Sequence, residues 1–176
     1  MPNLNGVKKR SEEANYINVT PNAEKPKYAF MGTGFTALDE SPNAQTSSKQ
    51  YINDDSATQN VTRYEPSWSY SIDQIKDQEA VTYLLEIGKL RKTGVDTITD
   101  ILCVDLDQPA TDSSGTQFHA RKQQVAVAPS NFGNNDGEMT GEGSLLGRGD
   151  VVEGVFDLEK VGTDEDPFTE GWTGNP

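Results

Sequence analysis

One stretch decides the fold: YINDDSATQNVTRYEPSWSYSIDQIKDQEAVTYLLEIGKLRK, residues Tyr51–Lys92. From Thr62 to Ile72, aromatic and apolar residues hold most even positions, whereas serines and charged residues hold the odd ones. Successive side chains of a strand point to opposite faces, so this alternation predicts a strand with one core-facing side and one polar side. Pro66 cannot donate to a ladder, so we expect the strand to be an edge or to be bulged there.

The second half of the stretch predicts an amphipathic helix over about 77–93. Asp77 is a favourable N-cap, and Gly94 can take the left-handed conformation that commonly ends a helix. Gly88 allows close approach to a sheet. Apolar residues recur at three- and four-residue spacing and define one buried face: Ala80, Val81, Leu84, Leu85 and Ile87. We expect this face to pack on the aromatic face of the preceding strand, formed by Tyr64, Trp68 and Tyr70.

The composition indicates a single domain that is short of core material. The chain has 176 residues, of which 33% are hydrophobic, and its mean hydropathy is -0.70. A core must therefore come from the central part, while much of the chain stays polar. We interpret the protein as a thin domain with long loops and arms that neighbouring subunits complete.

The charge argues against sequence-specific binding of nucleic acid. The net charge is -13, from 28 acidic and 15 basic residues, whereas neutralising phosphates requires clustered Lys and Arg. Such a surface repels DNA, which is useful only where a polyanion must slide without sticking.

The single cysteine and the hydropathy pattern exclude further classes. Cys103 cannot form an intrachain disulfide or a cysteine-based zinc site, and its apolar surroundings predict a buried small hydrophobe. The opening Met1-Pro2-Asn3-Leu4 contains no apolar run, so no signal peptide is predicted. No stretch approaches the roughly 20 apolar residues of a membrane span, and we expect no membrane insertion.

The chain divides into an N-terminal arm (1–26), a domain (27–160) and an acidic C-terminal arm (161–176). In the domain we expect a first strand over 27–35, a long polar loop over 36–50 and a short strand at 51–53. Beyond the helix we expect strands over 97–106, 117–128, 139–146 and 151–161, with a hairpin turn within 131–137. About seven strands and one helix predict an α+β fold, an antiparallel β-sandwich with one flanking α-helix.

The residues that could carry chemistry do not assemble into a catalytic motif. His119 is the single histidine and is expected in ordinary sheet placement. Carboxylate pairs are what an acidic chain produces by chance: Asp105 with Asp107, Asp54 with Asp55, and the run Asp164-Glu165-Asp166. We therefore predict no enzyme, no catalytic residues, no cofactor and no metal site.

Three loop motifs also have structural explanations. Asn134-Asn135-Asp136-Gly137-Glu138 is rich in oxygen ligands, but it lacks the EF-hand register and is better explained by a hairpin turn. Gly141-Glu142-Gly143 lacks the third glycine of a dinucleotide fingerprint. Arg148-Gly149-Asp150 is adhesion-like, but it has a high chance frequency, and we interpret it as turn geometry.

Several segments, in order, resemble the major tail tube proteins of long-tailed bacteriophages that infect Gram-positive bacteria. They are Tyr51-Ile52-Asn53-Asp54-Asp55-Ser56-Ala57-Thr58, Tyr64-Glu65-Pro66-Ser67-Trp68-Ser69-Tyr70 and Asp73-Gln74-Ile75-Lys76-Asp77-Gln78-Glu79-Ala80-Val81. Gly137-Glu138-Met139 and Gly149-Asp150, with Glu153-Gly154 and Phe156-Asp157, also look like that family. The similarity covers roughly residues 28–160 and leaves the arms unmatched.

The resemblance implies a virion structural protein. Hexameric rings of a β-sandwich would stack into a hollow tail tube, with the inner strands of six subunits forming one barrel through which double-stranded DNA passes without specific binding. The implied partners are further copies of the chain, tail terminator and tail tip proteins, and a tape measure protein within the lumen. Assembly would occur in the host cytoplasm.

Two other classes, and a variant of the first, stay open on the sequence. A carbohydrate-binding or adhesin-type β-sandwich of a virion or cell surface would need Tyr64, Trp68 and Tyr70 exposed as a platform. A small hydrolase would need two carboxylates converging in a pocket. Within the tube class, the protein could be the inner tube of a contractile injection device.

Overall fold

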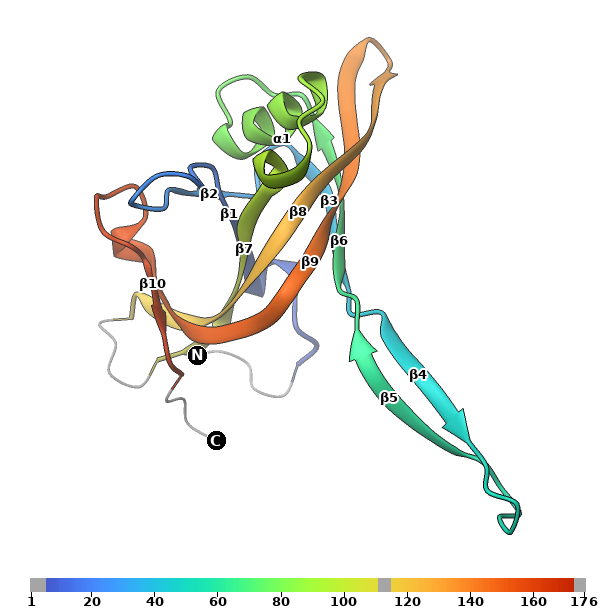
Figure 1. Cartoon of the computed structure of the whole chain (residues 1–176). Helices are drawn as coiled ribbons and strands as arrows, with labels where there is room; N and C mark the ends of the chain where they lie inside the picture. Colours follow the sequence, from blue (N-terminus) through green and yellow to red (C-terminus); the bar gives the residue numbers. More distant parts are fainter. Residues whose placement is uncertain (1–5, 111–114, 173–176) are drawn as a thin grey trace.

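The computed structural model describes residues 6–110 and 115–172, so the predictions that rest on Met1–Leu4 and on 173–176 lie outside the described residues. The described residues form ten strands and one α-helix, which lies against one side of the sheet (Figure 1). The strands are β1 (Glu13–Asn18), β2 (Tyr28–Phe30), β3 (Phe35–Ser41), β4 (Ala44–Lys49), β5 (Thr58–Tyr64), β6 (Ser67–Asp73), β7 (Ile98–Pro109), β8 (Gln117–Asn135), β9 (Glu138–Asp157) and β10 (Phe168–Glu170). The helices are α1 (Glu79–Lys89) and the short 3-10 turns η1 (Arg10–Glu12), η2 (Gly94–Thr97) and η3 (Leu158–Lys160).

Eight strands form one antiparallel sheet in the order β2-β1-β7-β8-β9-β6-β3, with β10 paired to β9. Strands β4 and β5 form a separate two-stranded sheet. The long strands β8 and β9 run through both halves of the domain (Figure 1). The predicted α+β antiparallel β-sandwich with one flanking helix is confirmed, although the described residues form ten strands rather than about seven.

The first hydrophobic core lies between α1 and the concave face of the sheet. Its buried members come from α1 and from strands at both ends of the sheet, which shows that the sheet curls around them: Ile17, Ala29, Met31, Trp68, Tyr70, Ile72, Ala80, Val81, Leu84, Ile87, Ile101, Cys103, Val125, Val127 and Leu145. Burying each large aliphatic side chain contributes about 1.5–3 kcal/mol relative to leaving it exposed.

A second core lies on the other face and includes Phe168 of β10, the strand that pairs with the end of β9. It contains Ala14, Tyr16, Tyr28, Leu102, Val104, Ala120, Phe156 and Phe168. Successive residues of β7 alternate between the two cores, with Ile101 and Cys103 in the first and Leu102 and Val104 in the second. Strand β7 is therefore buried on both faces, and Cys103 is buried as predicted.

The strand predicted over 62–72 is two strands, divided at Pro66. Trp68, Tyr70 and Ile72 alternate into the first core on β6, as the pattern predicts. Tyr64 ends β5 in the other sheet and its side chain is 61% exposed, so its expected place beneath the helix is wrong. Because Pro66 has no N–H to donate, the ladder stops there. The Pro66 carbonyl instead accepts a hydrogen bond from the Gly147 N–H at 2.8 Å.

Both predicted helix ends are displaced. The N-cap is Gln78 rather than Asp77, which has φ 66° and therefore turns the chain before the helix begins. At the other end, Arg91 has φ 52°, and its N–H donates to the Gly88 carbonyl while that of Lys92 donates to the Ile87 carbonyl. This is a Schellman motif closed by an arginine in place of the glycine expected at Gly94.

The face of the helix is as predicted at its centre. Val81 and Leu84 are fully buried and Leu85 is partly buried. At Gly88 a Cβ would lie 2.5 Å from Cζ of Phe132 and 2.9 Å from Cβ of Pro129. The glycine therefore permits the close helix–sheet approach that the sequence indicates.

The segment between the first strand and Pro66 differs most from expectation. The long loop predicted over 36–50 is replaced by β3 and β4, and the short strand predicted at 51–53 is the turn at the tip of the β4–β5 hairpin. β4 is built of Gln, Thr, Ser and Lys without apolar alternation, so it carries no strand signal of its own. Pairing with β5 supplies its hydrogen bonds.

Each terminal segment contributes a strand to the sheet. β1, within the segment interpreted as an N-terminal arm, lies between β2 and β7, and its Ile17 is fully buried. β10, within the C-terminal segment, pairs with β9 and buries Phe168. Among the described residues, no helix is both long enough and apolar enough to cross a membrane.

Candidate functional site

The β4–β5 hairpin extends far from the body of the domain, and this is the clearest candidate for an interaction surface (Figure 1). Every residue of β5 is exposed, and the tip presents Tyr51 at 67% and Ile52 at 109% of their reference surfaces. An isolated two-stranded hairpin is at best marginally stable in water. Its two outer edges also carry unpaired backbone groups that can template further pairing. These features are typical of an element that is completed by another chain.

The base of the hairpin is fixed to the domain by a compact turn. Asn43 has φ 50°, and its side-chain amide donates to the Glu65 carbonyl at 3.0 Å and to the Ser67 hydroxyl at 3.1 Å. The Glu65 N–H donates to the Asn43 carbonyl at 3.2 Å. Asn tolerates the left-handed region better than most residues, which explains its presence here. The base therefore defines the direction in which the hairpin leaves the sheet.

The two ends of the curled sheet are also open. Within the described residues, β2 pairs with β1 alone and β3 pairs with β6 alone. An unpaired edge invites aggregation unless it is covered or is used for assembly. In this protein both edges lie beside a pocket.

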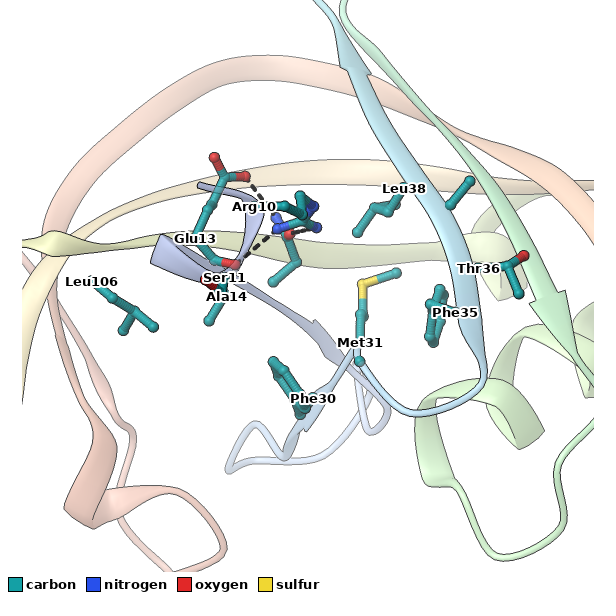
Figure 2. A pocket seen from close by; sticks show the side chains of 13 residues that line it. Arg10, Ser11, Glu13, Ala14, Phe30, Met31, Phe35, Thr36, Leu38 and Leu106 are labelled. Atoms are coloured by element: carbon teal, nitrogen blue, oxygen red, sulfur yellow. Dashed lines mark hydrogen bonds between the residues drawn. The ribbon is translucent and has the colours of Figure 1, made fainter. Parts of the chain in front are cut away.

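The pocket lies between β1, the turn after β2, and β3, and has a volume of about 480 Å³. Figure 2 shows Phe30, Met31, Phe35 and Leu38 around its apolar part, with Arg10 at the opposite side. The Arg10 guanidinium is held by the Glu13 carbonyl at 2.8 Å and by Oδ1 of Asn15 at 2.6 Å. The lining is largely apolar, with Arg10 and Glu13 on its polar side, and Glu13 is the only carboxylate among the described residues that line it.

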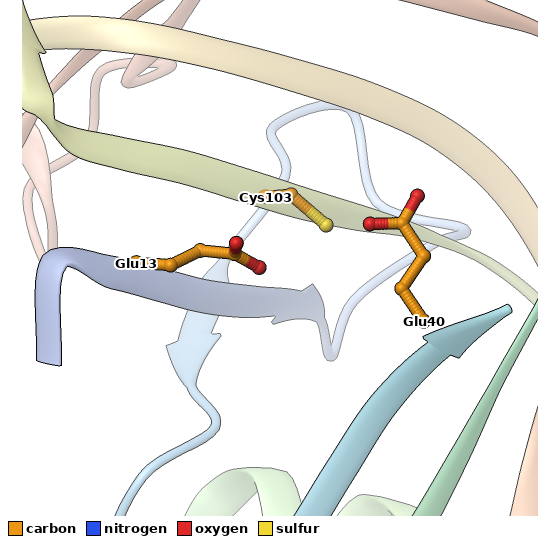
Figure 3. A group of neighbouring side chains, drawn as sticks. All are labelled: Glu13, Glu40 and Cys103. Atoms are coloured by element: carbon orange, nitrogen blue, oxygen red, sulfur yellow. The ribbon is translucent and has the colours of Figure 1, made fainter. Parts of the chain in front are cut away.

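Glu13, Glu40 and Cys103 lie close together inside the curl, with their candidate ligand atoms within 4.8 Å of one another (Figure 3). Burial raises the pKa of the Cys103 thiol to about 12, so it stays protonated, whereas metal ligation requires the thiolate. Glu40 already forms a two-pronged ion pair with Arg121. The cluster therefore fits a satisfied polar group better than a metal centre.

His119 and Asp105 form a buried pair at one end of the sheet. His119 Nδ1 donates to Asp105 Oδ2 at 2.9 Å, Lys8 Nζ pairs with the other Asp105 oxygen, and the Trp172 ring lies 4.7 Å from the His119 ring. Burial acts to raise the pKa of Asp105, but the hydrogen bonds from Lys8 and His119 outweigh it and lower that pKa. Lys8 also approaches Asp107 at 3.1 Å. Lys8 of the N-terminal segment thus pairs with both Asp105 and Asp107, and Trp172 of the C-terminal segment lies against His119, so both terminal segments contact this end of the sheet.

The remaining sequence motifs fall on hairpin turns or within β9. Asp136 and Gly137 both have positive φ and form the two-residue turn between β8 and β9, as the hairpin interpretation of the calcium-like run requires. Arg148-Gly149-Asp150 lies within β9, where Gly149 has φ 64° beside the register shift in the β8–β9 ladder, so the predicted turn is an irregularity in one continuous strand. Asp54 and Asp55 lie at the exposed hairpin tip.

Comparison with solved structures finds similar folds, among them chains of gene transfer agent particles. The chain is similar to a chain in the tail of an empty gene transfer agent particle, refined with C6 helical symmetry, with a TM-score of 0.56 and 12% identity over 82% of this chain and 97% of that chain. It is equally similar to a chain of the native gene transfer agent virion, with a TM-score of 0.56 and 11% identity over the same shares. At this identity the similarity shows a shared fold. Neither a protein-family model nor a curated protein sequence matches the chain.

Two candidate features escaped sequence reasoning. The hairpin strands are too polar to show the period of a strand, and the pocket is built from segments that were expected to be an arm and a loop. The exposed Tyr51 and Ile52, two large apolar residues in a polar stretch, were the one local signal that could have indicated the hairpin tip.

Proposed function

We propose that this chain is the structural subunit of a virion tail tube. Copies would form hexameric rings that stack into a hollow tube through which double-stranded DNA passes. The observation that carries the proposal is the β4–β5 hairpin, a separate two-stranded sheet that projects from the domain and is held to it at its base (Figure 1). The fold likeness to a chain from a tail of C6 symmetry, over 97% of that chain, supports this choice.

The open sheet edges support ring formation. The outer edges of β2 and β3 carry backbone groups that a neighbouring subunit can satisfy. A contact that joins two different surfaces of identical chains closes into a ring when the rotation permits, and otherwise grows as a filament. The same chain can thus supply ring contacts through the sheet and contacts between rings through the hairpin.

The acidic composition suits a channel for DNA. Each subunit brings a net charge of -13, and a negative wall repels phosphates over a Debye length of about 8 Å at physiological salt. DNA would therefore slide without specific binding. Residues lining the lumen would be acidic or neutral rather than basic.

The proposal predicts where the protein is located and which proteins it contacts. It is a non-enzymatic component of the virion tail, assembled in the host cytoplasm. Its partners are other copies of itself, tail terminator and tail tip proteins at the two ends, and a tape measure protein in the lumen. Both the non-contractile tube and the inner tube of a contractile device are compatible with this arrangement.

The carbohydrate-binding alternative loses its main requirement. Trp68 and Tyr70 are each only 3% exposed, so they cannot form a sugar platform with Tyr64. The aromatic side chains of β6 serve the core instead.

Negative-stain microscopy of the purified full chain over a range of concentrations tests the proposal, and hollow tubes or rings are expected. A matched variant replaces residues 42–66 by Asn-Gly, because Ser41 and Ser67 are paired and a two-residue turn can join β3 directly to β6. This variant should stay folded by circular dichroism but form no tubes. A wild-type chain that stays monodisperse and monomeric at high concentration contradicts the proposal.

A further inference from the structure

The chain carries two apolar features that cannot meet within one molecule. The hairpin tip exposes Ile52 completely and Tyr51 by about two thirds, and the pocket between β1 and β3 exposes Phe30 at 52% beside Leu38. The hairpin points away from the domain, so its tip lies far from the pocket of the same chain (Figure 1). Within one molecule the tip therefore has no apolar surface to contact, and a second copy would provide one in its pocket.

The shapes of the two features are complementary. The tip is a narrow turn, closed by the Asp54 N–H donating to the Tyr51 carbonyl at 3.0 Å, so adjacent apolar side chains extend from a small backbone. The pocket holds about 480 Å³ and is lined by apolar side chains of β1, β2 and β3. A volume of this size is within the usual range for sites that bury compact apolar groups.

The charges beside the two features are also complementary. Two exposed carboxylates, Asp54 and Asp55, follow the apolar residues at the tip. On the pocket side, Arg10 lines the pocket beside the exposed Lys9, whereas Lys8 is paired with Asp105 and Asp107. Attraction between such patches steers association and fixes its register.

We infer that the β4–β5 hairpin of one copy seats Tyr51 and Ile52 in the pocket between β1 and β3 of a second copy, with Asp54 and Asp55 against the Lys9 and Arg10 rim. This inference rests on the proposed function and names the surface that receives the hairpin. We call the Tyr51–Ile52 tip the plug and the pocket between β1 and β3 the socket. They lie on different surfaces of the chain, so every copy offers both, and the contact can be repeated from one copy to the next.

Site-directed disulfide formation tests the location directly. Ile52→Cys in one batch and Thr36→Cys in a second batch, which carries a larger tag, are mixed at a concentration that supports assembly and are then oxidised. Thr36 is exposed and lines the pocket, while the native Cys103 is buried. The expected product is the mixed disulfide between the two batches. Leu146→Cys, an exposed apolar position outside the pocket lining, replaces Thr36→Cys as the matched control and should give little mixed product.

Two substitutions test the energetics from opposite sides. Ile52→Asp removes the plug, and Ser11→Trp fills the socket from an exposed position on η1. Burying one large aliphatic side chain is worth enough to change an equilibrium constant about ten- to hundredfold. Each variant should therefore raise the concentration needed for assembly by that factor. Val95→Asp and Val95→Trp are the controls, because Val95 is exposed on η2 and does not line the pocket.

The outcomes separate the inference from the function on which it rests. Wild-type assembly with mixed disulfide at Thr36, and weakened assembly of both variants, supports the plug and socket. Wild-type assembly with equal cross-linking at Thr36 and Leu146, and unaltered assembly of Ile52→Asp, overturns the socket and leaves the tube function standing. A wild-type chain that forms no assembly removes both.

Discussion

Arg121 and Glu40 form a two-pronged ion pair between strands that are not neighbours in the sheet. Arg121 Nη1 lies 3.0 Å from Glu40 Oε1, and Nη2 lies 3.1 Å from Oε2. Arg121 is on β8 and Glu40 is on β3, at the end of the strand order. The pair therefore fastens the curl of the sheet, which brings β3 back over the first core.

The geometry of this pair can be tested by substitution. Arg121→Lys keeps the charge but loses the planar guanidinium, so we expect the free energy of unfolding to fall by about 1 kcal/mol. The value is modest because both side chains are partly exposed. Glu40→Gln should cost a similar amount. Urea unfolding of both single variants and of the double variant measures the coupling energy. A coupling energy of zero would show that the curl does not depend on this pair.

Arg91 closes the helix in a conformation that suits glycine better. Its φ is 52°, and the left-handed region costs a residue with a Cβ about 1–2 kcal/mol. Arg91→Gly should therefore raise the free energy of unfolding by about 1 kcal/mol, despite the greater freedom of glycine in the unfolded chain. Arg91→Ala removes the same side chain and keeps the strain, so it is the matched control. The prediction fails if the two variants have the same urea midpoint.

Gly154 is required by the close approach of β10. A Cβ at this position would lie 2.2 Å from the Thr169 carbonyl oxygen and 2.6 Å from the Phe168 ring. Gly154→Ala should displace β10 and cost about 1–3 kcal/mol, because a backbone atom cannot move aside as a flexible side chain can. Hydrogen exchange should then show lost protection at Phe168–Glu170 while β8 stays protected. Phe168→Ala should give the same pattern, and unchanged β10 protection in Gly154→Ala would contradict the argument.

Asp105 links stability to acid pH. Its pKa is lowered in the folded protein, since the hydrogen bonds from Lys8 and His119 outweigh the effect of burial. Asp105 therefore contributes stability that is present above its unfolded pKa of about 3.9 and is lost as the pH falls through its lower folded pKa. Relative to Asp105→Asn, the wild type should be more stable by about 1–2 kcal/mol at pH 6, and this advantage should shrink below about pH 4. Urea midpoints of both proteins from pH 6 to 3 measure the difference, and a constant difference over this range would refute the linkage.

The sequence predicted those parts of the fold in which the periodic spacing of apolar residues matches their burial in the structure. The alternation of Trp68, Tyr70 and Ile72 places all three in the core, and the helical spacing of Val81 and Leu84 does the same. It did not place Tyr64, because the strand breaks at Pro66 and the two halves enter different sheets. The alternation alone could not distinguish one long strand from two short ones.

The candidate interaction surface was less accessible to prediction. Tyr51 and Ile52 have the composition of a strand but lie at a turn, where their exposure depends on how far the hairpin leaves the domain. The pocket joins η1, β1 and β3, segments without a sequence pattern that connects them. Their proximity follows from the curl of the sheet.

By itself, the sequence determined the elements whose stability is local. The Asp136-Gly137 turn, the apolar face of α1 and the apolar run of β7 each follow from the conformational preferences or burial of neighbouring residues. Only the tertiary structure decided that β1, β3, β4 and β10 are strands. It also decided where the curled sheet ends and which apolar residues stay exposed to solvent. The physical reason is that backbone hydrogen bonding between strands is nearly independent of side chains, so polar segments become strands when a distant segment supplies the partner.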